Sequence, residues 1–183
     1  MAKQFSEITP RLRTFIEHQK LFFVATAAAE GHVNLSPKGM ETFRVLGENR
    51  VAWLNLTGSG NESAAHVLED PRMTIMFCAF DGDPMILRLY GEATAVHKND
   101  PQWTEIAAVF PSLPGARQCF DVRVTLVQAS CGFGVPLMDY VGDRDQLISW
   151  ATRQGESGVR RYWEKKNTVS LDGKPTHILQ KNT

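Results

Sequence analysis

Apolar and polar residues alternate along much of the first 135 positions, and short turns separate the alternating runs. Strands are predicted at residues 21–29, 32–37, 43–46, 50–56, 72–80, 85–97 and 117–134. Connections this short require antiparallel pairing, because parallel neighbours need a long crossover segment. Closing such a sheet removes exposed edges. The pattern therefore predicts a mainly β protein, a six- to seven-stranded antiparallel barrel with flanking helices.

Helical spacing interrupts this pattern at three places in the first 135 residues. A helix is predicted over 8–19, with Thr9 as its cap and Pro10 in its first turn. A second follows Asn61 or Ser59, either of which suits the N-cap position. A third is predicted over 100–110, with Asp100 as cap. Gly91 lies inside a long strand, which predicts a bulge there.

The tail has a different character. It contains a predicted helix over 143–153, a glycine break and a second, basic helix over 156–166. We therefore divide the chain into a barrel domain, residues 1–135, and a helical C-terminal extension, residues 136–183. The extension is expected to pack on the barrel or on a second subunit.

Composition narrows the class of protein. The chain has 183 residues, of which 43% are hydrophobic, and its 20 basic residues balance its 20 acidic ones. This balance argues against a nucleic-acid-coating protein, which would carry a basic excess. No apolar run reaches the length of a membrane span, and three cysteines without zinc spacing indicate reduced thiols. We expect a cytoplasmic protein without a membrane segment, and the spacing of its histidines predicts no metal site.

Two short stretches carry candidate chemistry. HVNLSPKG (32–39) places Val33 and Leu35 on one face of a strand and Asn34 and Ser36 on the other, before Lys38. It is either a half-buried hairpin strand that runs into a turn, or a polar face that holds an anion together with the lysine. LNLTGSGNESAAH (54–66) is similar to a strand, glycine-rich loop and helix junction, whose free N–H groups suit a phosphate. A capped surface helix is the alternative interpretation.

The order of the motifs extends this interpretation. FFVATAAAEGHVNLSPKG, LNLTGSGNESAAHVLEDPRMTIMF and LRLYGEA follow one another as in the pyridoxamine 5'-phosphate oxidase-like, FMN-binding split-barrel family, which residues 10–135 resemble. The resemblance implies an FMN-binding split barrel and a homodimer with the cofactor at the subunit interface. The cofactor-binding residues that it implies are Ser36, Pro37, Lys38, Gly39, Leu54, Asn55, Ser59, Gly60, Asn61, Glu62 and Arg88.

The implied roles differ along the chain. Residues 36–39 would border the flavin and its phosphate or ribityl chain, residues 54–55 would contact it from the adjacent strand, and residues 59–62 would surround the phosphate. Arg88 would meet a phosphate or the other subunit. The oxidases of the family place an Arg-Lys pair just inside the inserted helix, where this chain has Gly60-Asn61-Glu62. Helix N–H groups and Lys38 would compensate, and Glu62 would cap the helix or face away.

The resemblance is to a subgroup distinct from the oxidase itself, because the oxidase's C-terminal Trp- and Arg-containing segment is unmatched. We expect an FMN-dependent oxidoreductase that takes electrons from a small molecule or a nicotinamide; its substrate and catalytic residues are not indicated. The alternative is a non-catalytic protein that binds or senses flavin, haem or a deazaflavin. His66, on the inserted helix, is interpreted as a capped or partly buried helix histidine without a catalytic partner.

Overall fold

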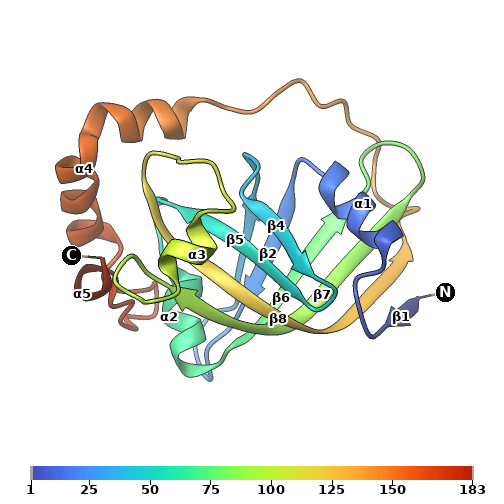
Figure 1. Cartoon of the computed structure of the whole chain (residues 1–183), viewed down its shortest axis with the longest axis horizontal. Coiled ribbons are helices and arrows are strands. Elements are labelled where there is room, and N and C mark those ends of the chain that lie inside the picture. Colours follow the sequence, from blue (N-terminus) through green and yellow to red (C-terminus); the bar gives the residue numbers. More distant parts are fainter. Residues whose placement is uncertain (1, 183) are drawn as a thin grey trace.

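The computed structural model describes residues 2–182, and an antiparallel sheet forms its centre (Figure 1). The described strands are β1 (Lys3–Phe5), β2 (Phe22–Thr26), β3 (Asn34–Lys38), β4 (Phe43–Gly47), β5 (Arg50–Leu56), β6 (Arg72–Cys78), β7 (Met85–Val96) and β8 (Ala116–Cys131). Their order is β3-β2-β6-β7-β8-β5-β4, and β1 pairs with β8. The predicted antiparallel fold is confirmed, with one short strand, β1, that the sequence pattern did not indicate.

The core lies inside the curved sheet, and its largest side chains come from five of the strands. Trp53, Phe77 and Phe120 are almost fully buried, and the rings of Trp53 and Phe120 stack at 4.4 Å between centroids. The pairing of β7 with β8 shifts register between Tyr90 and Gly91, as the glycine predicted. A Cβ atom at position 91 would overlap the carbonyl of a β8 residue, which is why glycine is required at this bulge.

Three helices flank the strands: α1 (Pro10–His18), α2 (Glu62–Glu69) and α3 (Trp103–Ala107). Thr9 caps α1 as predicted, since its Oγ1 accepts a hydrogen bond from the N–H of Leu12. The third helix is shorter than predicted, and Asp100 does not cap it. The carboxylate of Asp100 instead accepts a hydrogen bond from the N–H of His97, at 2.8 Å, and so closes a turn directly after β7.

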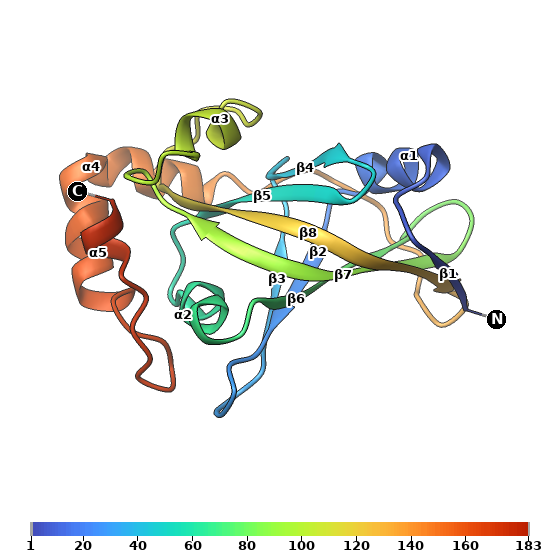
Figure 2. The same ribbon diagram turned by 60° about the horizontal axis from the view of Figure 1, so that its bottom comes forward.

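The chain beyond β8 crosses the outside of the sheet before it forms helices again. Figure 1 shows residues 132–145 running from the end of β8 to α4 (Gln146–Lys166) without a helix or strand. Gly155 has a φ of 61°, which divides α4 into two segments at the predicted glycine break. In the two views, α4 and α5 (Ile178–Lys181) stand at the end of the sheet where α2 lies (Figures 1 and 2). None of the described helices is long and apolar enough to cross a bilayer.

Candidate anion-binding cleft

A cleft of about 660 Å³ is lined by residues of β3, β5 and the first turn of α2. Residues 36–38 of β3 line one side of it, and Asn55 of β5 and the turn at residues 59–62 line another. The structure therefore brings the two stretches that the sequence singled out to the same cavity. The polar side chains of Asn34 and Ser36 face this cleft, whereas Leu35 is 64% exposed on the opposite face of the strand.

Three of the residues that sequence analysis assigned to the cofactor lie outside this cleft. Leu54 alternates with its cleft-lining neighbours Trp53 and Asn55, so its side chain packs on the other side of the sheet. Arg88 lies on β7 and donates a hydrogen bond to Ser130 Oγ at 3.3 Å. Gly39 follows the end of β3 and lines a neighbouring pocket instead. We do not assign these three residues to the ligand of the cleft.

Lys38 reaches over the buried floor of the cleft. Its Nζ lies 5.5 Å from the ring centroid of Trp53, a geometry in which the ring attracts a cation. Burial, together with the positive charge of Arg117, lowers the pKa of Lys38 from 10.5 to about 8. Lys38 is therefore charged at neutral pH, but it is held in surroundings that favour the neutral amine.

Arg117, at the start of β8, is the main residue of this cleft that sequence analysis missed. It is 3% exposed, and its Nη1 donates a hydrogen bond to Asn167 Oδ1 at 2.9 Å. Burial lowers its pKa to about 9. Within residues 2–182, neither Arg117 nor Lys38 forms an ion pair with a carboxylate. The sequence signal was weak, because Arg117 stands at the start of a predicted strand next to the polar residue Gln118.

The first turn of α2 adds hydrogen-bond donors to the cleft. Asn61 occupies the predicted N-cap position, but its side chain makes no capping bond; its Oδ1 accepts from Gln118 Nε2 at 2.6 Å. Its Nδ2 is buried and has no partner among the described residues. The first N–H groups of a helix also lack intrahelical partners, and this end of the helix is positive. These donors make the start of α2 complementary to an anion.

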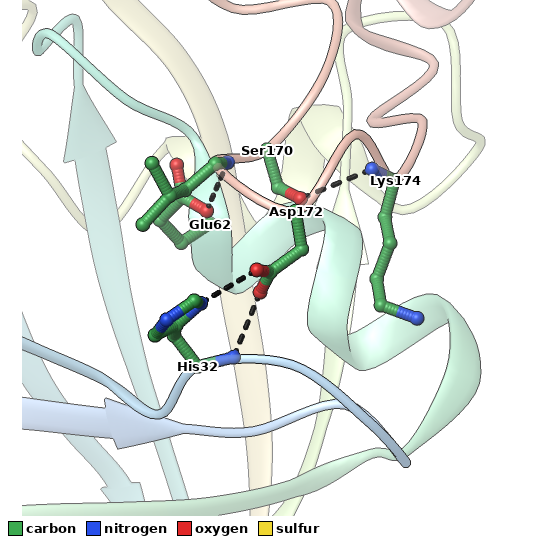
Figure 3. Close-up of polar contacts among 6 residues, drawn as sticks. His32, Glu62, Ser170, Asp172 and Lys174 are labelled. Atoms are coloured by element: carbon green, nitrogen blue, oxygen red, sulfur yellow. Dashed lines mark hydrogen bonds and ion pairs between the residues drawn. The ribbon is translucent and has the colours of Figure 1, made fainter.

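Glu62 lines the cleft, but its carboxylate is engaged with the C-terminal extension. Its Oε2 accepts a hydrogen bond from the N–H of Leu171, at 2.8 Å, in the C-terminal extension. Figure 3 shows the carboxylate of Glu62 turned toward the backbone of the extension. Glu62 therefore holds a neighbouring loop, and its negative charge partly offsets the positive charge of Arg117.

The loop at residues 168–176, called here the latch loop, ties the extension to the barrel. The carboxylate of Asp172 accepts hydrogen bonds from the N–H and Nδ1 of His32, at 2.8 and 2.7 Å (Figure 3). Lys174 Nζ contacts both carboxylate oxygens of Glu69, on α2, at 2.7 and 2.8 Å. Ser170 and Leu171 of the latch loop line the cleft, so the extension forms one of its walls.

Comparison with known proteins places this geometry in a wider group. Residues 8–131 match the family model described as pyridoxamine 5'-phosphate oxidase. The chain is 35% identical, over 191 aligned residues, to the pyridoxamine 5'-phosphate oxidase family protein ustO of Aspergillus flavus; the match covers 93% of this chain and 76% of that protein.

Solved structures resemble the barrel at lower identity. A Lactobacillus delbrueckii protein assigned as a pyridoxamine 5'-phosphate oxidase superposes with a TM-score of 0.54 and 17% identity, over 67% of this chain and 94% of that one. A variant of HupZ from Group A Streptococcus gives 0.54 and 17%, over 67% and 99%. These similarities confirm the predicted split-barrel fold.

Proposed function

Because this chain belongs to the pyridoxamine 5'-phosphate oxidase family, we propose that its cleft binds FMN and that the protein is an FMN-dependent oxidoreductase. The observation that carries this proposal is the pair of cations, Lys38 and Arg117, that line one cleft without an ion-pair partner among residues 2–182. Holding a desolvated positive charge without a counter-ion costs free energy. A bound phosphate would offset that cost, and this gives the pair a reason to be there.

The phosphate of FMN fits the end of the cleft at α2. There it would meet Lys38, Arg117, the free N–H groups of the first helical turn and the unpaired Nδ2 of Asn61. Arg117 and Lys38 come from two different strands, and together they supply the two charges of the Arg-Lys pair that the helix lacks. Ser36 and Asn55 would lie along the rest of the ligand, because they line the cleft beside Lys38.

Bound FMN supplies the ability to accept a hydride or electrons, while the protein binds and orients it. The ionisable side chains that line the cleft are Lys38, Arg117, Lys165, Lys166 and Glu62. None of them forms the neighbouring acid and base of a hydrolase, which agrees with a reaction carried by the cofactor. The electron donor would be a small molecule or a nicotinamide.

We further propose a homodimer with the cofactor at the subunit interface. The strand β3 is at one edge of the sheet; Leu35 within it, on the face turned away from the cleft, is 64% exposed, and Val33 just before it is 71% exposed. Val169 and Leu171, which line the cleft, are 50% and 77% exposed. Exposed apolar groups on this edge strand and beside the cleft suit burial against a second copy. Sedimentation of the wild type and of Leu35→Glu tests this, with a dimer expected only for the wild type.

The alternative is a protein that binds or senses flavin, haem or a deazaflavin without turnover. The charge of the cleft favours it equally, since four cations and one carboxylate line the cavity and would bind an anionic ligand whether or not it reacts. The two functions differ in the fate of the bound ligand. An oxidoreductase passes electrons on, whereas a storage or sensing protein holds its ligand unchanged.

Titration of FMN into the purified protein, followed by flavin fluorescence, tests the proposal. FMN should bind at least about tenfold more tightly than riboflavin, which lacks the phosphate and its charge-assisted hydrogen bonds. Equal affinities would contradict the phosphate site, and no uptake of FMN would refute flavin binding. Bleaching of the bound flavin by NADH or NADPH, and its return in air, would support the oxidoreductase. Binding without bleaching by any reductant tried would favour the alternative.

A further inference from the structure

A chain of side-chain hydrogen bonds leads from the wall of the cleft to buried His66. Asn34 Nδ2 donates to Ser63 Oγ at 3.3 Å. Ser63 Oγ lies 3.1 Å from Thr26 Oγ1, which lies 3.1 Å from His66 Nδ1. Ser63 lines the cleft, whereas Thr26 and His66 are 3% and 1% exposed. This series of hydrogen bonds therefore connects the ligand-facing wall of the cleft to a histidine that is too deeply buried to contact the ligand.

The other ring nitrogen of His66 indicates which groups donate and which accept in this series of hydrogen bonds. Nε2 is buried and has no partner among residues 2–182. If Nδ1 carries the proton, His66 donates to Thr26, Thr26 donates to Ser63, and the unpaired Nε2 is only a lone pair. In the opposite direction, a buried N–H is left without an acceptor, which is the rarer and costlier arrangement in proteins.

The direction of the chain fixes what Ser63 offers to the cleft. A hydroxyl has one proton and two lone pairs. When Ser63 Oγ accepts from Asn34 and from Thr26, both lone pairs are used, and its proton is left to point into the cleft. That cleft holds the positive groups Lys38 and Arg117 and the start of α2, so its ligand is an anion that accepts hydrogen bonds.

We propose that His66 is a positioning residue, which acts through Thr26 to turn the hydroxyl of Ser63 toward the phosphate of the bound ligand. The inference rests on the proposed function only in requiring that the cleft binds a phosphate. The proposal gives a role to buried His66, which would not contact the ligand. It adds two buried side chains, Thr26 and His66, to the residues that support the anion site.

The proton position on His66 provides a direct test. Long-range ¹H–¹⁵N spectra of protein labelled at histidine nitrogens distinguish the two neutral tautomers, and the signals of His66 are those missing from His66→Asn. With the cleft saturated by inorganic phosphate, His66 should show the Nδ1–H form, which is the minor form in free histidine. A spectrum in which His66 carries its proton on Nε2 under these conditions overturns the proposal.

Two substitutions at the same position give the matched comparison. Asparagine places an N–H donor where Nδ1 lies, whereas glutamine places its amide one bond further out, near Nε2. His66→Asn should therefore bind phosphate nearly as well as the wild type, and His66→Gln should bind it about three- to tenfold more weakly. Equal affinities of the two variants would count against positioning through Thr26.

Substitutions along the chain complete the test. Ser63→Ala should weaken phosphate binding about tenfold or more, because it deletes a hydrogen bond to a charged group. Thr26→Val should weaken it less, and Thr94→Val, on an exposed part of β7, should leave it unchanged. Thr26→Val with full affinity and an unchanged His66 spectrum overturns the proposal. FMN and phosphate binding with His66 in the other tautomer would refute the positioning role alone, whereas no binding of either ligand would refute the proposed function as well.

Discussion

Replacing Arg117 by methionine should make the ligand-free protein more stable while weakening its affinity for FMN. Arg117 is buried at the end of the cleft. Its guanidinium donates a hydrogen bond to the neutral amide oxygen of Asn167 in the C-terminal extension. Methionine has a similar length and no charge, so it fills the space without the cost of a desolvated cation. A residue whose removal stabilises the fold and impairs binding is serving the ligand.

The size of the effect follows from the surroundings of Arg117. Burial lowers the pKa of Arg117 from the ordinary arginine value to about 9, and at ~1.4 kcal/mol per pH unit this corresponds to about 5 kcal/mol for keeping the charge inside the fold. Methionine would leave the buried Oδ1 of Asn167 without its donor, which costs about 1–3 kcal/mol. Allowing for relaxation of the charged side chain, we expect a net gain of about 2 kcal/mol, or about 4–8 °C in Tm for a chain of this length.

Thermal unfolding of the ligand-free protein and FMN fluorescence titration measure the two sides of this prediction. The loss of one charge-assisted hydrogen bond should raise the Kd for FMN about tenfold to a hundredfold. Arg123→Met is the matched control, because Arg123 lies on the same strand, its side chain is 66% exposed, and it pairs with Glu92 outside the cleft. The control should change neither quantity appreciably. A less stable Arg117→Met protein with unchanged affinity would refute the reasoning.

Three further predictions concern the cleft and the latch loop. The pKa of Lys38 is about 8 without ligand, and a bound phosphate would keep the amine charged, so affinity for FMN should be nearly level well below pH 8 and fall about fivefold from pH 8 to pH 9. Lys38→Met should remove this decline in pH-dependent titrations. Gly31→Ala should release the latch loop and speed up hydrogen exchange at residues 168–176, because Gly31 has a φ of 102° and a Cβ atom at this position would overlap the carboxylate of Asp172. Gly82→Ala is the control, since it introduces similar backbone strain without the overlap. Faster exchange at residues 168–176 in both variants would contradict the role of the contact with Asp172. The hydrogen bond between His32 and Asp172 raises the pKa of His32 and lowers the pKa of Asp172, so the ion pair stabilises the latch loop between the lowered pKa of Asp172 and the raised pKa of His32, and this stabilisation is lost as pH rises through the pKa of His32. Hydrogen-exchange rates in the latch loop, corrected for the intrinsic effect of pH, should therefore be slower at pH 5.5 than at pH 8. Asp172→Asn should show no such difference.

Features that depend on local chemistry could be predicted from the sequence. The strand at residues 50–56 matches β5 residue for residue, since it is a mostly apolar run between two turn-forming segments. Gly91 and Gly155 each marked a local irregularity that the structure contains, because glycine within a regular element usually answers a backbone requirement. The meeting of residues 36–38 with residues 59–62 was implied by the family resemblance rather than by local chemistry.

Features that depend on which strands become neighbours could not be predicted. Arg117 reaches the cleft because β8 pairs with β5, which places Gln118 opposite Asn55. No local pattern specifies that pairing. The interpretation of His66 as a helix histidine was correct, but its hydrogen-bond partner could not be predicted for the same reason, since Thr26 lies on a strand far away in the sequence. On β3 the alternation was correct, but the face that carries Leu35 is exposed and the polar face lines the cleft.

The side chain that holds Arg117 in place comes from a segment outside the stretch that matches the family. Asn167 accepts from Arg117 and donates through its Nδ2 to the carbonyl of Gly58 at 3.1 Å, so a single amide from the end of α4 braces both the cation and the glycine-rich turn. Relatives that share the barrel but carry another tail would lack this brace even if every barrel residue were identical. Replacing the C-terminal extension, in evolution or by grafting in the laboratory, is thus a way to change the affinity for a phosphorylated ligand without altering the sheet.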